Sequence, residues 1–61
     1  MSNQARAFIH FLIDNEIEFS CTWDEFDLNY QIHIILDNVE HIIDFYDTVK
    51  MADVQYEILN Y

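Results

Sequence analysis

One stretch of the sequence decides the expected fold: DNVEHIIDFYDTVK, which covers residues 37–50. Its apolar side chains recur at the spacing of a buried helical face, at Val39, Ile42, Ile43, Tyr46 and Val49. Its acidic side chains recur on a different face, at Asp37, Glu40, Asp44 and Asp47. Together the two patterns predict an amphipathic helix over residues 37–50, capped at its start by Asp37 or Asn38, with a row of carboxylates along one side.

The segments around this stretch follow other periods. Residues 3–15 repeat apolar side chains with helical spacing, which predicts a first helix. Residues 16–23 and 28–36 alternate apolar and polar side chains, the pattern of half-buried strands, and the acidic segment 24–27 predicts a hairpin turn between them. Residues 54–60 alternate again and predict a third strand.

These elements predict a single small α+β domain over residues 1–61, in the order α-β-β-α-β. We expect a three-stranded sheet with two helices packed on one face, and a right-handed return to the last strand if that strand is parallel to its neighbour. Glycine and proline are both absent, so the turns must be made by Asn, Asp and Ser.

The composition suggests that this domain associates with something. Of its 61 residues, 52% are hydrophobic and 16% are aromatic. A domain of this size buries only about 60% of the surface of its unfolded chain, which is too little to hide so much apolar material. We therefore expect either a homodimer or a large apolar contact with a partner.

The charge balance restricts the kind of partner. Twelve Asp and Glu residues stand against two basic residues, Arg6 and Lys50, for a net charge of −10. Nucleic acids and anionic membrane surfaces repel such a chain, so we expect no direct binding to either. A basic protein surface should attract it.

The carboxylates of the predicted helix suggest which basic surface this is. They would repeat about every 5 Å along the helix axis, similar to the roughly 3.4 Å of axis per phosphate in one DNA strand. That pitch suits a groove built for DNA or RNA, with Phe26 as an apolar anchor in an acidic rim, whereas the alternative is a merely solvated face. The predicted partner-binding residues are Glu16, Glu18, Asp24, Glu25, Phe26, Asp27, Asp37, Glu40, Asp44 and Asp47.

The cysteine content and the hydropathy pattern favour a cytoplasmic location. Cys21 is the single cysteine, which excludes an intrachain disulfide and suits a reducing compartment. The apolar run over residues 7–13 is interrupted by His10 and is too short to span a bilayer. We expect a cytoplasmic protein, located in the host cytoplasm if a virus encodes it.

The sequence contains no motif that indicates catalysis or a cofactor. It lacks a nucleophile elbow, a glycine-rich phosphate loop and an HExxH pair. Segment 24–27 lacks the alternating oxygen ligands of a calcium loop. His41, with Asp37 and Asp44 nearby on the predicted helix, is better interpreted as a surface histidine than as a metal ligand. We expect no enzyme activity, no cofactor and no metal.

The sequence therefore predicts a small acidic inhibitor that mimics nucleic acid and occupies the DNA- or RNA-binding surface of a target protein. Enzymes of restriction, CRISPR or repair systems are the kind of target that such a viral inhibitor would block. The alternative is a cytoplasmic assembly module, such as a dimeric adaptor or an antitoxin-like subunit, whose acidity serves solubility and partner choice.

Overall fold

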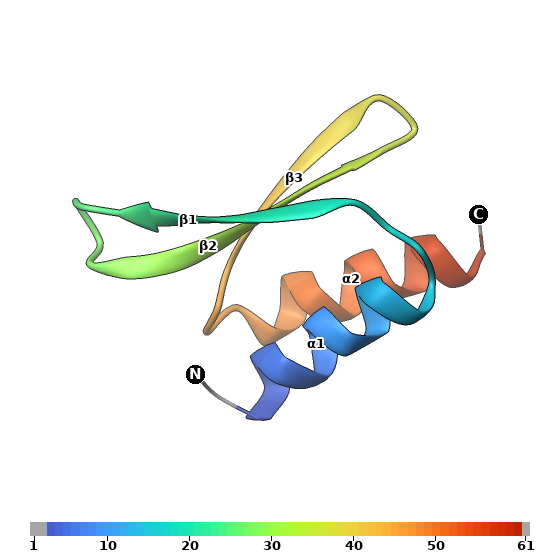
Figure 1. The fold of residues 1–61 in the computed structure, drawn as a ribbon, viewed down its shortest axis with the longest axis horizontal. Coiled ribbons are helices and arrows are strands. Elements are labelled where there is room, and N and C mark those ends of the chain that lie inside the picture. The colour runs from blue at the N-terminus through green and yellow to red at the C-terminus, as the bar shows by residue number, and fades with distance from the viewer. Residues whose placement is uncertain (1–2, 61) are drawn as a thin grey trace.

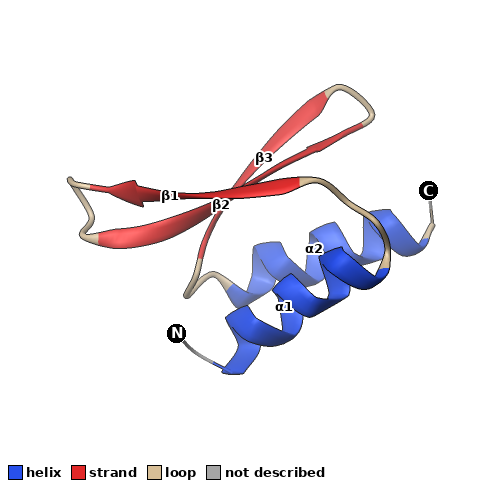
Figure 2. Cartoon of the chain, in the orientation of Figure 1, coloured by secondary structure: helices blue, strands red, loops and turns tan. Residues whose placement is uncertain are grey.

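The computed structural model describes residues 3–60, and there the chain forms a small compact α+β domain (Figure 1). Its elements are α1 (Asn3–Asp14), β1 (Phe19–Asp24), β2 (Asn29–Leu36), β3 (Val39–Asp44) and α2 (Thr48–Leu59). The order is thus helix, three strands, helix (Figure 2), and the predicted order α-β-β-α-β is wrong in its last two elements. Within the described range no helix has the length and apolar character needed to cross a membrane.

The first helix confirms the prediction over residues 3–15 to within one residue. Ala5, Phe8 and Leu12, spaced by three and four positions, are its buried residues. The helix ends in a Schellman motif: the Ile17 N–H donates to the Leu12 carbonyl at 2.9 Å and the Glu16 N–H donates to the Ile13 carbonyl at 3.0 Å. Glu16 has a left-handed φ of 58°. Glycine adopts this conformation most easily, but the chain contains no glycine, so a residue with a β-carbon occupies the position.

The predicted hairpin is confirmed in its two strands, but the first strand begins at Phe19 and not at residue 16, because residues 16 and 17 form the C-terminal cap of α1. Strands β1 and β2 pair antiparallel, from Phe19 opposite Ile34 to Asp24 opposite Asn29. Alternation along β2 buries Ile32 and Ile34 on one face, while the residues between them face the other side of the sheet. The period-two pattern was therefore a reliable indicator in this part of the chain.

The predicted helix over residues 37–50 is wrong. Asp37 and Asn38, with φ of 50° and 66°, form a two-residue turn that returns the chain as strand β3, antiparallel to β2. A hairpin turn of this length needs positive φ at both central residues, and Asp and Asn tolerate that conformation better than other residues that have a β-carbon. The same stretch also alternates, with His41 and Ile43 on the helix-facing side of β3.

The predicted strand over residues 54–60 is wrong for a related reason. Helix α2 covers this segment, and its buried residues are Met51 and Val54, with Ile58 packed against the core one turn later. That helical spacing was hidden by an accidental alternation over only seven positions. Asp47 begins the helix, because its carboxylate accepts a hydrogen bond of 3.1 Å from the Lys50 N–H.

The three strands form one antiparallel sheet in the order β1-β2-β3, so no parallel β-α-β connection exists among the described strands. Both helices pack side by side against the same face, as predicted (Figure 1). The core between the layers consists of Ala5, Phe8, Leu12, Ile32, Ile34, Leu36, Ile43, Met51 and Val54. The other face of the sheet has no helix over it in the described chain.

The free cysteine lies at the margin of the core. Cys21 is opposite Ile32 on the helix-facing side, but it stays exposed because β1 is an edge strand. Partial burial raises the pKa of the Cys21 thiol above its ordinary value. The thiol is therefore less reactive than a free cysteine in solution at neutral pH.

Candidate protein-binding surface

The structure divides the ten predicted contact residues between two ends of the sheet. Asp37 lies in the β2–β3 turn and Asp47 caps α2, so the regular helical row of carboxylates does not exist. One group gathers around the β1–β2 turn: Asp24, Glu25, Phe26, Asp27, Asp44 and Asp47. The other lies around the β2–β3 turn: Glu16, Glu18, Asp37 and Glu40.

The β1–β2 turn is built by Asp24. Its Oδ1 accepts hydrogen bonds from the backbone N–H of Phe26 at 2.9 Å and of Asp27 at 3.3 Å. This turn holds two large apolar side chains in solvent, since Phe26 is 97% and Leu28 is 72% exposed. Leu28 also has a φ of 53°, a conformation that is costly for a residue with a β-carbon.

An aromatic column next to this turn runs from β1 across β2 to the residue that follows β3. Trp23 and Tyr30 are cross-strand partners whose ring centroids lie 5.0 Å apart in an edge-to-face arrangement. Phe45 follows β3 and lies on the other side of Tyr30, with 5.9 Å between the ring centroids. The column is on the helix-facing side, yet half of the Trp23 surface remains exposed (50%). Figure 1 shows the reason: the β1–β2 turn extends past the ends of both helices.

A network of carboxylates lies on the opposite face of the sheet from this column, because Asp24, Gln31 and Asp44 alternate with the helix-facing residues of their strands. Gln31 donates through Nε2 to Asp24 at 3.2 Å and to Asp44 at 3.1 Å, which joins both edge strands across β2. Asp44 also accepts from Asn29 at 3.2 Å. The bonds fix two of the predicted acidic residues in place and show that they have structural roles as well.

Tyr46 lies among the same carboxylates. The negative charge of Asp44 raises the pKa of the Tyr46 hydroxyl above its ordinary value, with smaller contributions from slight desolvation and from Asp27 and Asp47. Tyr46 is thus close to both the β1–β2 turn and the start of α2. We call this region the hairpin end, which consists of Trp23, Asp24, Glu25, Phe26, Asp27, Leu28, Tyr30, Asp44, Phe45 and Tyr46.

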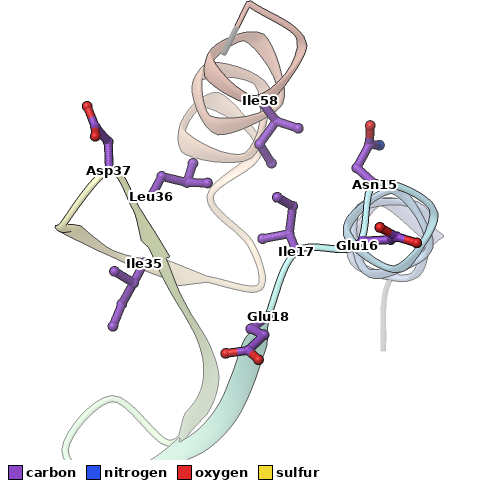
Figure 3. Close-up of a pocket in the computed structure, with 8 residues that line it drawn as sticks. All are labelled: Asn15, Glu16, Ile17, Glu18, Ile35, Leu36, Asp37 and Ile58. Carbon is purple, nitrogen blue, oxygen red and sulfur yellow. The ribbon is translucent and has the colours of Figure 1, made fainter.

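A shallow hollow of about 450 Å³ marks the opposite end (Figure 3). Ile17, Leu36 and Ile58 form its apolar part, and Figure 3 shows them pointing into the space between the strands and α2. The carboxylates of Glu16 and Asp37 lie at its margins, on opposite sides. Since the hollow is wide open to solvent, it would not enclose a small molecule.

A hydrogen-bonded chain crosses the uncovered face of the sheet. Thr22 Oγ1 lies 2.7 Å from His33 Nε2, and His33 Nδ1 lies 3.3 Å from Glu40 Oε1. Thr22 and His33 were not among the residues predicted from the sequence, because they become neighbours only once the strand register is known. A hydroxyl, an imidazole and a carboxylate in this order resemble the nucleophile, base and orienting group of a catalytic triad. These three side chains lie on an open face of the sheet, however, where water is not excluded as it is from an active site. We interpret it as a cross-strand link.

His41 lies in a setting that differs from the predicted one. It is on the helix-facing side of β3, where its Nε2 is 3.3 Å from Glu57 Oε2 of α2, without hydrogen-bond geometry. The contact joins the sheet to the helix. Over residues 3–60, no group of three or more His, Cys, Asp or Glu side chains is arranged to hold a metal ion.

The acidic side chains as a whole lack basic partners. All twelve carboxylates lie within residues 3–60, and none of them is buried. Among these residues no carboxylate forms an ion pair with Lys or Arg; the two ion pairs involve His33 and His41. Lys50 is directed to a backbone carbonyl, that of Ile42, at 3.4 Å. The negative charge is therefore not neutralised within the described part of the chain.

Comparison with protein families, with curated proteins and with solved structures found no match.

Proposed function

We propose that this protein is a small acidic inhibitor that binds the basic DNA- or RNA-binding surface of another protein and keeps nucleic acid out. One observation supports it above the others: twelve exposed or partly exposed carboxylates have no Lys or Arg ion pair in the described structure. Hydrogen bonds hold Asp24, Asp44 and Asp47 in place, but the chain has only two basic residues to offset its twelve carboxylates. Their free negative charge is the property that a basic surface recognises.

The mechanism is competitive occupancy. Opposite charges accelerate the encounter and orient the two proteins, and apolar contacts then hold the complex. The proposal does not require carboxylates spaced regularly like phosphates, because Asp37 lies in a turn, Glu40 and Asp44 on β3, and Asp47 at the start of α2. The protein would mimic nucleic acid in the sign and the density of its charge.

Affinity capture with competition tests the proposal. The immobilised protein is incubated with a lysate of the organism that encodes it or of that organism's host, and bound proteins are challenged with duplex DNA, with RNA and with increasing NaCl. We expect nucleic-acid-binding proteins that are released by one of the nucleic acids and by salt. Proteins that stay bound in excess DNA and RNA, and in about 0.5 M NaCl, would contradict the proposal.

The control variant must lose charge without losing structure. Asp24, Asp44 and Asp47 are unsuitable, because they accept hydrogen bonds that shape the turn, the sheet and the start of α2. Four other carboxylates form no side-chain hydrogen bond with residues 3–60 and can be neutralised together: Glu16→Gln, Glu18→Gln, Glu25→Gln and Asp27→Asn. This variant should fold normally, capture less protein and release it at lower salt.

The second candidate is the assembly module. The exposed apolar residues at the turn favour it, since Phe26 and Leu28 offer a contact that does not depend on charge. In that case the captured proteins would resist nucleic-acid competition and would be lost in Phe26→Ala, and the four-residue neutralised variant would bind normally.

A further inference from the structure

The face of the sheet that no helix of the described chain covers is acidic, but it is not wholly polar. The strand register places on it every second residue of each strand, opposite the core residues. These residues are Ser20, Thr22, Asp24, Gln31, His33, Ile35, Glu40, Ile42 and Asp44. Residues 7–49 include neither Lys nor Arg, so none of the three strands carries a permanent positive charge. Lys50 of α2 donates to the backbone carbonyl of Ile42 and not to a carboxylate.

Two carboxylates are held close together at one end of this face. Asp24 of β1 and Asp44 of β3 both accept a hydrogen bond from the same nitrogen, Gln31 Nε2, at 3.2 Å and 3.1 Å. We call these two residues the Asp pair. The bonds fix both negative charges without neutralising either, because the Gln31 amide is uncharged.

A second pair of carboxylates lies at the other end of the face, on either side of Ile35. Glu40 is opposite Ile35 on β3, and Glu18 directly precedes β1 on the other side of β2. Glu18, Ile35 and Glu40 line one shallow hollow of about 540 Å³. Figure 3 shows Glu18 and Ile35 on the side of the sheet away from Leu36. We call Glu18 and Glu40 the Glu pair.

Apolar surface lies between the two pairs. Ile35 is 68% exposed, and Ile42, which is opposite His33 in the row between the pairs, is 43% exposed. Lysine and arginine suit this combination, because their aliphatic stems cover apolar surface while their charged heads stay at its margin. A stem lying on Ile35 would bring its charge to the Glu pair, and a stem lying on Ile42 would bring its charge to Asp44.

Other occupants fit this face less well. A second copy of this chain would bring another net charge of −10 to it. A purely apolar partner would bury the two pairs of carboxylates without a counter-charge, which is costly. Nucleic acid is repelled by the same groups.

We propose that the uncovered face of the sheet docks a basic segment of the partner protein, whose Lys or Arg side chains reach the Asp pair and the Glu pair with their stems on Ile35 and Ile42. The pairs are four residues of β2 apart, from Gln31 to Ile35, so the charges of the segment should lie about 13 Å apart. The inference rests on the proposed function, since it identifies the part of the acidic surface that meets the basic partner.

Hexa-lysine is a defined probe for this site. Its binding is measured by calorimetry at low salt, and the contact is located by NMR through the methyl signals of the protein. We expect saturable binding that shifts the methyl signals of Ile35 and Ile42 and leaves those of Val49 and Leu59, which are exposed on α2, nearly unchanged. No binding of hexa-lysine, or larger shifts on α2 than on the sheet, would overturn the proposal.

Two pairs of variants separate a local site from general charge attraction. Glu18→Gln and Asp53→Asn each remove one charge from an exposed side chain, the first at the hollow and the second on α2. Ile35→Thr and Val49→Thr each make a β-branched side chain polar, and the two positions are 68% and 70% exposed. We expect about fourfold weaker hexa-lysine binding for Glu18→Gln and about threefold for Ile35→Thr, with both α2 variants within about 1.5-fold of the parent protein.

The outcomes distinguish this inference from the proposed function. Equal losses within each pair of variants would mean that net charge alone attracts hexa-lysine, which overturns the docking site and leaves capture and release by DNA or RNA to decide the proposed function. A dimer that dissociates in Ile35→Thr would show that a second copy occupies the face, and would overturn the inference too. A hexa-lysine site on this face, combined with captured proteins that resist nucleic-acid competition, would sustain the inference and defeat the proposed function.

Discussion

Individual residues of the hairpin end are held in a strongly negative local field. Tyr46 reports this field, because Asp44 and, to a lesser extent, Asp27 and Asp47 raise the pKa of its hydroxyl. A neutral hydroxyl is favoured there over a phenolate, since ionisation would add one more negative charge. The folded protein thus holds this proton more tightly than the unfolded chain does, and ionisation weakens the fold only as the pH rises above the ordinary tyrosine value.

Replacement of the main source of that field should be directly visible. In Asp44→Asn the pKa of Tyr46 should fall towards its ordinary value, because the largest charge contribution is removed. The titration is followed through the ring carbon signals of Tyr46 by NMR. An unchanged Tyr46 titration would show that Asp44 does not govern the local field.

The backbone of Leu28 supplies a second test at this scale. Its φ of 53° costs on the order of 1 kcal/mol or more for a residue with a β-carbon and nearly nothing for glycine. Leu28→Gly should therefore raise the free energy of unfolding by about 0.5–1 kcal/mol in urea denaturation, although a side chain is lost. Leu28→Ala keeps the β-carbon and should bring no gain. A destabilised glycine variant would mean that the Leu28 side chain has contacts that outweigh the backbone cost.

At the scale of elements, the sequence predicts well where one period dominates. The helix over residues 3–15 and the hairpin of 16–36 have a single clear pattern, and the structure confirms the helix to within one residue and the hairpin from Phe19 onward. Residues 37–50 satisfy a helical and an alternating pattern at the same time, and the acidic positions agreed with the helical one. The Asp37-Asn38 pair can form either a helix cap or a two-residue hairpin turn, and in the structure it forms the turn that begins β3.

The candidate surface could be predicted from the sequence only in part. Residues next to each other in the chain, such as the acidic turn with Phe26, could be recognised from the sequence. Contacts across strands could not, because the Trp23–Tyr30–Phe45 column and the Thr22–His33 contact depend on the register between strands. A one-residue change in register would place each of these side chains on the other face.

Helix α2 depends on a residue that was assigned to binding from sequence alone. Asp47 accepts a hydrogen bond from the Lys50 N–H and so satisfies one of the free donors of the first turn. Asp47→Ala should lower the free energy of unfolding by about 1 kcal/mol, measured by chemical denaturation followed by circular dichroism. Asp53→Ala removes the same charge inside the helix and should leave stability unchanged or slightly higher. Equal effects of both variants would exclude a capping role for Asp47.

For the whole molecule, the unpaired carboxylates repel one another as well as attracting a partner. With a net charge of −10, the compact state concentrates like charges that the unfolded chain separates. Added NaCl screens this repulsion, so the melting temperature should rise between about 10 mM and 300 mM NaCl. Calorimetry or circular dichroism measures the change.

The variant Glu16→Gln, Glu18→Gln, Glu25→Gln and Asp27→Asn again provides the comparison. With four fewer charges it should melt at a higher temperature in low salt and respond less to added NaCl. A melting temperature that is independent of salt in the parent protein would show that self-repulsion contributes little to its stability.

The consecutive strand order also has a consequence for how the chain folds. Each strand pairs with its neighbour in sequence across a turn of two or four residues, so most of the sheet can form from contacts that are close along the chain. The packing of α1 and α2 on each other and on the sheet joins segments that are far apart in the sequence. Ile32→Val, in the central strand shared by both hairpins, should mainly slow refolding, whereas Met51→Ala, at the helix layer, should mainly accelerate unfolding in stopped-flow experiments. The sheet would then be the folding nucleus, and docking of the terminal helices would be the last step to native structure.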